Sequence, residues 1–355
     1  MKKIIIILFF LLLLLSPRIY WQFKEKTEID MLIIDKTVPT TDYREHKGLF
    51  WFLKNEKIVK ENGGFFDIGI DYYGYDPYEE KPMDTYKHEN IKDVIYIADT
   101  YGVYSDDLED FADGDRSEKI YGGMEIFEWN EIMKSKGPET ILIAEYNAFA
   151  TPTEEATRKI MEKNLNVEWT GWTGRYFNDL NNTEIPNWMF ENYEKQYQQP
   201  WEFKSGGLVF VHITDKIIVI DEKELDTYVN FQLTEAGATR FEHVLNSNYG
   251  YWFDIVKPLN GAEVLAEYEL KMSKEAQSQL GQAGIPLTFP AVTHHAQDKT
   301  YYFSGDFADY KKENMVKWYR SDLIMRIFSN EESDFQWAAY IPLMREIMQP
   351  LQGER

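Results

Sequence analysis

The sequence predicts an α/β protein with an open, mostly parallel, flavodoxin-like sheet, a β-rich insertion and C-terminal helices. Three observations support this class. Short apolar runs, typical of strands buried on both faces, end in polar residues and are followed by helical patterns. After residue 165 an aromatic stretch with many strand-like runs interrupts the alternation. After residue 310 two helical patterns with apolar stripes close the chain.

These changes in residue pattern divide the chain into five segments. The α/β sheet is expected in residues 25–165 and again in residues 285–310, and the β-rich aromatic insertion in residues 166–284. Residues 1–24 precede the sheet as a membrane anchor or export signal, and residues 311–355 supply the C-terminal helices. A chain of 355 residues is long enough to bury a core of this size.

The N-terminus carries the features of an export signal. Lys2 and Lys3 precede twelve apolar residues, 4–15. Arg18 and the aromatic pair Tyr20-Trp21 then occupy the place of a cleavage site, and such residues sit well at a membrane interface. We expect one uncleaved anchor through residues 4–21, with the bulk of the chain outside the cytoplasm at the cell membrane. A cleaved signal is the alternative.

The first half of the chain alternates strands with helices. Strands are expected at residues 29–34, 65–71, 94–98 and 141–144, and helices at 46–57, 124–136 and 154–164. Gly137-Pro138 ends the second helix, and Thr153 is the expected N-cap of the third. The repeated unit is a buried strand, a polar end and a helix, which is the unit of an open α/β sheet.

Strand patterns dominate the next part. A hairpin is expected from 208–213 and 217–221 around Thr214-Asp215, with further strands at 229–233, 252–256, 262–270, 290–293 and 300–304. Helices follow at 314–328 and 335–348. Their polar faces are not strongly basic, so we expect them to pack on the core rather than to bind a membrane.

Composition excludes several classes of function. The net charge of −22 argues against a nucleic-acid partner, because phosphate binding needs clustered lysine and arginine. The chain has no cysteine, which removes disulfides, thiolate metal sites and thiol chemistry, and no cofactor is expected. Aromatic residues make up 16% of the chain, enough to leave rings on a surface that stacks on a saccharide or a protein partner.

Metal sites are not expected. The acidic stretch 105–118 offers Asp110, Asp113 and Asp115 for calcium, but the spacing of an EF-hand loop is missing, which favours a solvated loop. The adjacent pair His294-His295 lies on a predicted strand, where neighbouring side chains point to opposite faces. Two such histidines are poor ligands for one metal ion.

Three carboxylates follow predicted strands: Asp99, Glu145 and Asp306. If the strands are neighbours in a parallel sheet, the three meet in one crevice, where open α/β sheets bind ligands. Two carboxylates across a sugar can hydrolyse a glycosidic bond. The alternative is structural, since such carboxylates often cap helices or bind loop amides. Six nearby residues would hold a saccharide, namely Thr100, Tyr101, Tyr146, Asn147, Trp172 and Arg175.

A family resemblance rests on two stretches. A helix, a glycine, an apolar strand and a polar turn into a helix make up residues 124–163, and a late strand ends in FSGD at Phe303–Asp306. This pattern resembles the class I glutamine amidotransferase-like superfamily over residues 28–165 and 285–310. It is most similar to the degenerate branch that includes the β-galactosidase trimerisation domain and ThuA-like proteins.

The resemblance implies an amidotransferase-like fold that lacks the catalytic cysteine. Active members carry cysteine between glycines at the turn, with histidine and glutamate downstream, whereas this chain has Glu145-Tyr146-Asn147 there. Glutaminase activity is therefore not expected, because the thiolate is the attacking group. We expect a non-catalytic domain that binds a carbohydrate or a protein partner in an envelope or exopolysaccharide system. A glycan hydrolase and an oligomerisation module remain alternatives, and the ligand and the oligomeric state stay open.

Overall fold

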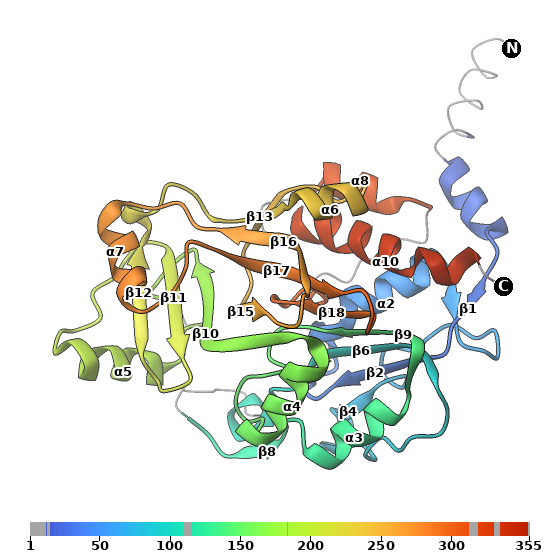
Figure 1. Cartoon of the computed structure of the whole chain (residues 1–355), viewed down its shortest axis with the longest axis horizontal. Coiled ribbons are helices and arrows are strands. Elements are labelled where there is room, and N and C mark those ends of the chain that lie inside the picture. Colours follow the sequence, from blue (N-terminus) through green and yellow to red (C-terminus); the bar gives the residue numbers. More distant parts are fainter. Residues whose placement is uncertain are drawn as a thin grey trace, which may run out of the picture.

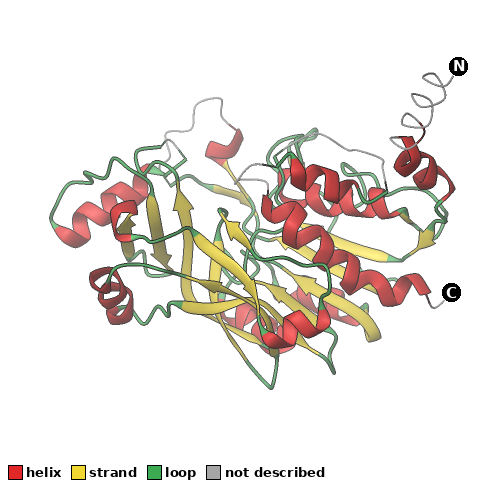
Figure 2. Cartoon of the chain, turned by 90° about the horizontal axis from the view of Figure 1, so that it is seen from above, coloured by secondary structure: helices red, strands yellow, loops and turns green. Residues whose placement is uncertain are grey.

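The computed structural model describes residues 12, 15–108, 116–182, 184–311, 319–329 and 334–353. These residues form a mixed α/β fold with a ten-stranded sheet and a separate four-stranded sheet (Figure 1). The expected α/β class is therefore confirmed at this level. The helix at residues 15–23 and the end of the last helix lie at the same end of the molecule (Figures 1 and 2).

The ten-stranded sheet is half parallel and half antiparallel. Its parallel part runs, in order, through β18 (Thr300–Phe303), β9 (Lys136–Ala144), β6 (Lys92–Asp99), β2 (Met31–Asp35) and β4 (Tyr73–Asp76). Its antiparallel strands are β14 (Ser247–Tyr249), β13 (Val229–Leu233), β16 (Glu263–Glu269), β17 (Thr288–His295) and, at the far edge, β5 (Lys81–Pro82). The sheet is therefore mixed, and the expected mostly parallel, flavodoxin-like character is not confirmed.

The four-stranded sheet is antiparallel throughout. It contains β12 (Ile217–Asp221), β11 (Gly207–His212), β10 (Val167–Phe177) and β15 (Phe253–Pro258). The predicted hairpin of 208–213 and 217–221 is confirmed as β11 and β12. Residues 166–284 supply this sheet and also β13, β14 and β16 of the larger one, so the aromatic segment is spread over both sheets.

Helices cover both faces of the parallel strands (Figure 1). Because successive side chains of a strand point to opposite faces, Ile33, Val94 and Ile143 belong to one core, with α2 (Arg44–Glu56) and α10 (Ile341–Gly353). Their neighbours Leu32, Ile95 and Leu142 belong to a second core with α3 (Ile126–Lys134) and α4 (Glu155–Leu165). Continuous apolar runs are what strands covered on both faces require.

The remaining elements are short. The helices are α5 (Asn187–Tyr197), α6 (Glu235–Arg240), α7 (Lys274–Gln282) and α8 (Ser321–Ile327). A π-helical turn, Gln336–Tyr340, leads directly into α10, and 3₁₀ turns lie at Ser105–Leu108 and Glu222–Glu224. Two small pairs of strands complete the structure, β1 (Thr27–Glu28) with β3 (Ile58–Val59) and β7 (Val103–Tyr104) with β8 (Lys119–Tyr121).

Three local predictions were wrong. Gly137-Pro138 does not end the second helix, because α3 ends at Lys134 and both residues lie in β9. Residues 65–71 form a turn rather than a strand, because Asp71 accepts the backbone N–H of Asp67 and Asp67 accepts that of Gly69. Thr153 is not the N-cap of α4, because its hydroxyl oxygen accepts the backbone N–H of Met124 at 3.0 Å. The errors at residues 65–71 and at Thr153 come from side chains that satisfy backbone groups elsewhere.

The N-terminal segment differs from expectation at one residue. The apolar run 4–15 lies outside the described residues except at positions 12 and 15, and no helix of the described part is long and apolar enough to cross a membrane. Trp21, expected at a membrane interface, is buried, and its indole N–H donates to the Asn55 carbonyl at 2.7 Å. Tyr20 is 55% exposed, and its ring lies 4.4 Å from that of Tyr319.

Candidate functional site at the strand ends

The carboxyl ends of the parallel strands bring the three predicted carboxylates together. Asp99 is the last residue of β6, Glu145 follows β9, and Asp306 follows β18. The negative charge of Asp99 acts on both Glu145 and Asp306, so all three lie within electrostatic range. This convergence follows from strand order, because β18, β9 and β6 are neighbours and parallel.

Glu145 is fully buried and surrounded by hydrogen-bond donors. The Tyr96 hydroxyl donates to one carboxyl oxygen, and the N–H groups of Phe307 and Ala308 donate to the other at 2.9 and 3.0 Å. Burial raises the pKa of Glu145 to about 8, although these donors favour the charged form. The side chain therefore ties β6 and β9 to the segment after β18.

Asp99 organises the loops on its side of the site. One carboxyl oxygen accepts the Thr37 hydroxyl at 2.6 Å and the Tyr101 N–H at 2.5 Å, and the other accepts the Asn147 amide at 3.1 Å. Burial, followed by the charge of Asp35, raises the pKa of Asp99 to about 7. Donors from three loops thus bind this carboxylate. This agrees with the alternative in which the strand-end acids have a structural role.

Asp306 lies in a charged group that sequence reasoning did not include. Burial and the neighbouring Asp309 raise the pKa of Asp306 well above its usual range. Asp309 pairs with Arg44 of α2 at 2.8 Å, and its pKa is raised by burial to about 6. Glu45 also faces this group, and burial raises its pKa as well. No pattern in the sequence places the start of α2 against the loop after β18.

A buried acid–imidazole pair was also missed. Asp35, the last residue of β2, lies 2.5 Å from Nδ1 of His46 on α2, and both side chains are inaccessible to solvent. Nε2 of His46 lies 3.0 Å from the Ile68 carbonyl, which can only accept, so this nitrogen carries a hydrogen. The strand-end rule that selected Asp99 also applied to Asp35, whereas its partner depended on helix packing.

The loop after β9 is longer than a tight strand-to-helix turn of the kind that holds a catalytic nucleophile. Residues 145–154 separate β9 from α4, and Asn147 adopts a left-handed conformation with φ 67°. Asparagine tolerates this conformation, so the turn carries little backbone strain. The Thr100 hydroxyl donates to the Asn147 carbonyl at 3.1 Å, which fixes the turn to the end of β6. Polar groups of this turn thus form hydrogen bonds within the protein.

The aromatic and basic residues expected to hold a saccharide differ in exposure. Tyr101 is 39% exposed, whereas Tyr146 is buried and stacks on Trp252 with ring centroids 6.5 Å apart. Trp172 lies on β10 in the core, 5% exposed, so its ring offers no face to a sugar. The guanidinium of Arg175 pairs with Glu184 and covers the ring of Phe177. Of the six expected ligand residues, Tyr101 is the exposed one.

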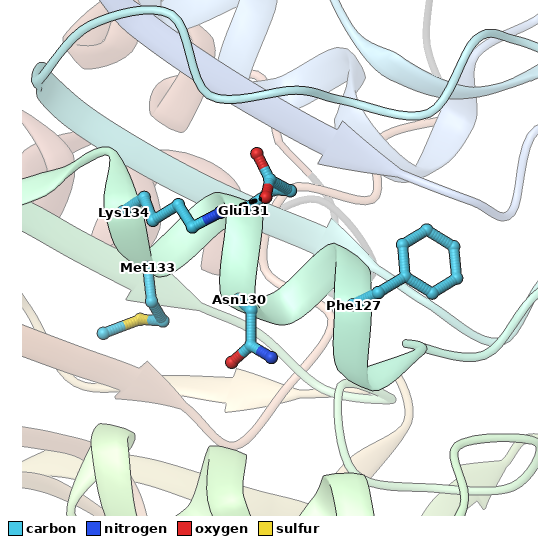
Figure 3. Close-up of a pocket in the computed structure, with 5 residues that line it drawn as sticks. All are labelled: Phe127, Asn130, Glu131, Met133 and Lys134. Carbon is cyan, nitrogen blue, oxygen red and sulfur yellow. Dashed lines mark hydrogen bonds and ion pairs between the residues drawn. The ribbon is translucent and has the colours of Figure 1, made fainter.

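Two hollows of the described surface lie away from this site. One, of about 530 Å³, follows the exposed side of α3 (Figure 3) and is lined by Phe127, Asn130, Glu131, Met133 and Lys134. A larger one, of about 830 Å³, lies at the opposite edge of the sheet, near the amino ends of β6 and β9. Among the described residues, no group of three or more histidine or acidic side chains could hold a metal ion. The stretch with Asp110, Asp113 and Asp115 lies outside these residues.

No protein-family model, curated protein or solved structure matches this chain. The resemblance to the class I amidotransferase-like superfamily therefore remains a hypothesis based on the pattern of the sequence.

Proposed function

We propose that this chain is a non-catalytic, amidotransferase-like domain that binds a saccharide in an envelope or exopolysaccharide system. One observation carries the proposal. At the turn where an active amidotransferase holds its nucleophile, this chain has Glu145, and protein donors occupy both oxygens of that buried side chain. A group so enclosed cannot attack a substrate, because attack needs a free lone pair and access.

The binding surface of this proposal is the outer rim of the strand ends. Tyr101 presents its ring there, beside Tyr104 with ring centroids 4.7 Å apart. Phenol rings of this kind offer a flat apolar face and a hydroxyl, which suits stacking on a sugar. In this proposal Asp99 supports the loop by accepting the Tyr101 N–H, so a buried acid positions an exposed aromatic ring.

A glycan array tests the proposal. The wild-type protein should bind a glycan without releasing products, and Tyr101→Ala should weaken binding by about tenfold, since such a contact contributes about 1–3 kcal/mol. Phe328→Ala, which removes an exposed aromatic ring at the end of α8, should bind as the wild type does. Unchanged binding by Tyr101→Ala would refute the proposed surface.

The second candidate is a glycan hydrolase that uses Asp99, Glu145 and Asp306. It is favoured by the raised pKa values of Asp99, about 7, and of Glu145, about 8, because a carboxyl that keeps its proton near neutral pH can act as an acid. Mass spectrometry of glycans incubated with the protein separates the two functions. Products that disappear with Glu145→Gln would establish the hydrolase and exclude the non-catalytic domain.

Attachment to the cell membrane through residues 4–21, with the bulk of the chain extracytoplasmic, belongs to the same proposal. It is supported by the apolar run and the preceding lysines. Extraction of membranes with alkaline carbonate should leave the full-length chain in the pellet, whereas a chain without residues 1–24 should be released. Equal release of both forms would exclude the anchor.

A further inference from the structure

The hollow at the amino ends of the parallel strands contains a group of donors that the proposed saccharide surface does not use. Arg240 is the last residue of α6, His294 lies near the end of β17, and Tyr301 lies near the start of β18. The rings of His294 and Tyr301 have centroids 4.3 Å apart, and the Arg240 guanidinium lies 5.7 Å from the Tyr301 ring. The helix α6 and the hairpin of β17 and β18, which are distant in sequence from each other, thus place polar side chains in one hollow of about 830 Å³.

The hydrogen bonds within this group leave donors directed away from it. Nη2 of Arg240 donates to the Tyr301 oxygen at 2.5 Å, so the Tyr301 O–H must point elsewhere. Nη1 of Arg240 lies 3.4 Å from Nδ1 of His294. An arginine can only donate, so Nδ1 is the acceptor and the imidazole hydrogen is on Nε2. Burial and the charge of Arg240 lower the pKa of His294 to about 4, which agrees with a neutral ring.

The positive charge of Arg240 is not balanced by a neighbour. The other cations of the hollow have acidic partners: Lys299 pairs with Glu139, and Lys92 pairs with Asp30 at 3.0 Å. Within the part of the chain that the structure describes, no carboxylate lies within 4.0 Å of the Arg240 guanidinium. Arg240 is exposed, so its guanidinium can pair with an anionic ligand that enters this concave site.

Part of the wall beyond these donors is apolar. Ile29 and Ile141 line the hollow from the sheet side, and Ile347, Pro350 and Leu351 line it from the last turns of α10. A ligand site with mainly apolar walls and a few convergent polar groups is the usual design for small organic molecules. Three carboxylates, Glu28, Asp93 and Glu139, also line the hollow; Glu139 pairs with Lys299, and Asp93 accepts the Asp30 N–H. The group around Arg240 is the part that offers donors, so it selects the charged head of the ligand, while the apolar part of the wall accepts its hydrocarbon part.

We propose that this hollow binds an amphipathic organic anion. Its oxyanion head, a carboxylate or a phosphate, accepts hydrogen bonds from the Arg240 guanidinium, the Tyr301 hydroxyl and Nε2 of His294. Its apolar part lies against the isoleucines of the sheet and the end of α10. The site is separate from the saccharide surface at the other edge of the sheet, so either proposal can fail without the other.

Calorimetric titration of the full chain with octanoate, octyl phosphate and 1-octanol tests the site, each below its aggregation concentration. At least one of the two anions should bind, and octanol should bind at least tenfold more weakly, because it lacks the charge that pairs with Arg240. The stronger of the two anions identifies the head group. Octanol that binds as well as both anions, or a protein that binds neither anion, would overturn the proposal.

Variants separate the head-group contact from general packing. Arg240→Gln should weaken binding of the anion by on the order of tenfold to a hundredfold, as expected for a lost charge-assisted hydrogen bond. Tyr301→Phe, which keeps the ring, should weaken it by less. Arg326→Gln removes the same charge from an exposed site on α8 and should leave affinity unchanged. A thermal melt shows whether each variant is folded, and a folded Arg240→Gln with wild-type affinity would overturn the assignment.

Discussion

The hydroxyl group of Tyr96 donates a hydrogen bond to the carboxyl group of Glu145, and both side chains are fully buried. The same hydroxyl lies 2.9 Å from that of Tyr340, in the turn that leads into α10. A buried series of hydrogen bonds therefore joins β6, the loop after β9 and the turn that leads into α10. Such a network specifies how the elements meet, because each member is costly to bury without its partner.

Acidification should stabilise this protein. Burial raises the pKa values of Asp99 and Asp254 to about 7 and that of Glu145 to about 8, above the values of these groups in an unfolded chain. The folded state therefore holds protons that the unfolded state releases, and stability falls as pH rises from about 4 to 8. The free energy of unfolding should fall by on the order of 1 kcal/mol per pH unit over this window.

Urea denaturation at pH 5, 6, 7 and 8 measures this slope. Glu145→Gln should make the profile flatter, because the group that ionises is gone, and the exposed Glu61→Gln should leave it unchanged. A free energy of unfolding that rises with pH over this window would contradict the prediction.

Tyr96→Phe should destabilise the fold by about 1–3 kcal/mol, the cost of leaving a buried acceptor without its donor. The ring and its packing are kept, so the loss reports the hydroxyl. Tyr20→Phe, at a residue that is 55% exposed, should change stability by less than about 0.5 kcal/mol. Equal unfolding free energies of Tyr96→Phe and the wild type would show that the network contributes nothing measurable.

Lys36→Met should be more damaging. The Lys36 ammonium contacts the Glu128 carboxylate at 2.5 Å and the Gly123 carbonyl at 2.8 Å, and both side chains of the ion pair are buried. Removing the cation leaves Glu128 without its counterion, which we expect to cost about 3–5 kcal/mol. In the control, Lys134→Met breaks a more exposed pair with Glu131 and should cost much less. Chemical denaturation that gives similar losses for the two variants would contradict this difference.

Gly74→Ala should prevent β4 from pairing with β2. A Cβ at residue 74 would lie 1.5 Å from the Asp35 carbonyl oxygen, a backbone atom of the neighbouring strand. The strands would have to separate, which we expect to cost more than about 3 kcal/mol. Gly250→Ala adds the same atom to open space and should be within about 1 kcal/mol of the wild type. Circular dichroism melts of both variants check this contrast, and a Gly74→Ala protein as stable as Gly250→Ala would show that β4 can move aside without cost.

The strand-end carboxylates could be predicted because the information is local. An apolar run followed by Asp99 or Glu145 indicates where a buried strand stops, and parallel neighbours then bring those ends together. The pattern could not show that Glu145 would be enclosed by Tyr96 and by two N–H groups from the segment after β18. Those partners come from residues far away in sequence, and only the packed chain places them there.

For the same reason, the sequence could not show which aromatic side chains are exposed to solvent. Tyr101 and Trp172 both follow polar or glycine-rich stretches, yet Tyr101 is 39% exposed and Trp172 is 5% exposed. Whether a ring meets water depends on which sheet its strand joins and on what covers that sheet.

The sequence by itself determined the order of most strands and helices, the lack of thiol chemistry and the polar ends of the parallel strands. These follow from the period of apolar residues and from residue types along a short window of chain. Only the tertiary structure decided that β13, β14 and β16 extend the main sheet, that the strand-end acids are enclosed, and that Arg240 faces a hollow without an acidic neighbour. Those outcomes depend on contacts between distant segments, whose energies are summed over the whole fold and leave no local pattern.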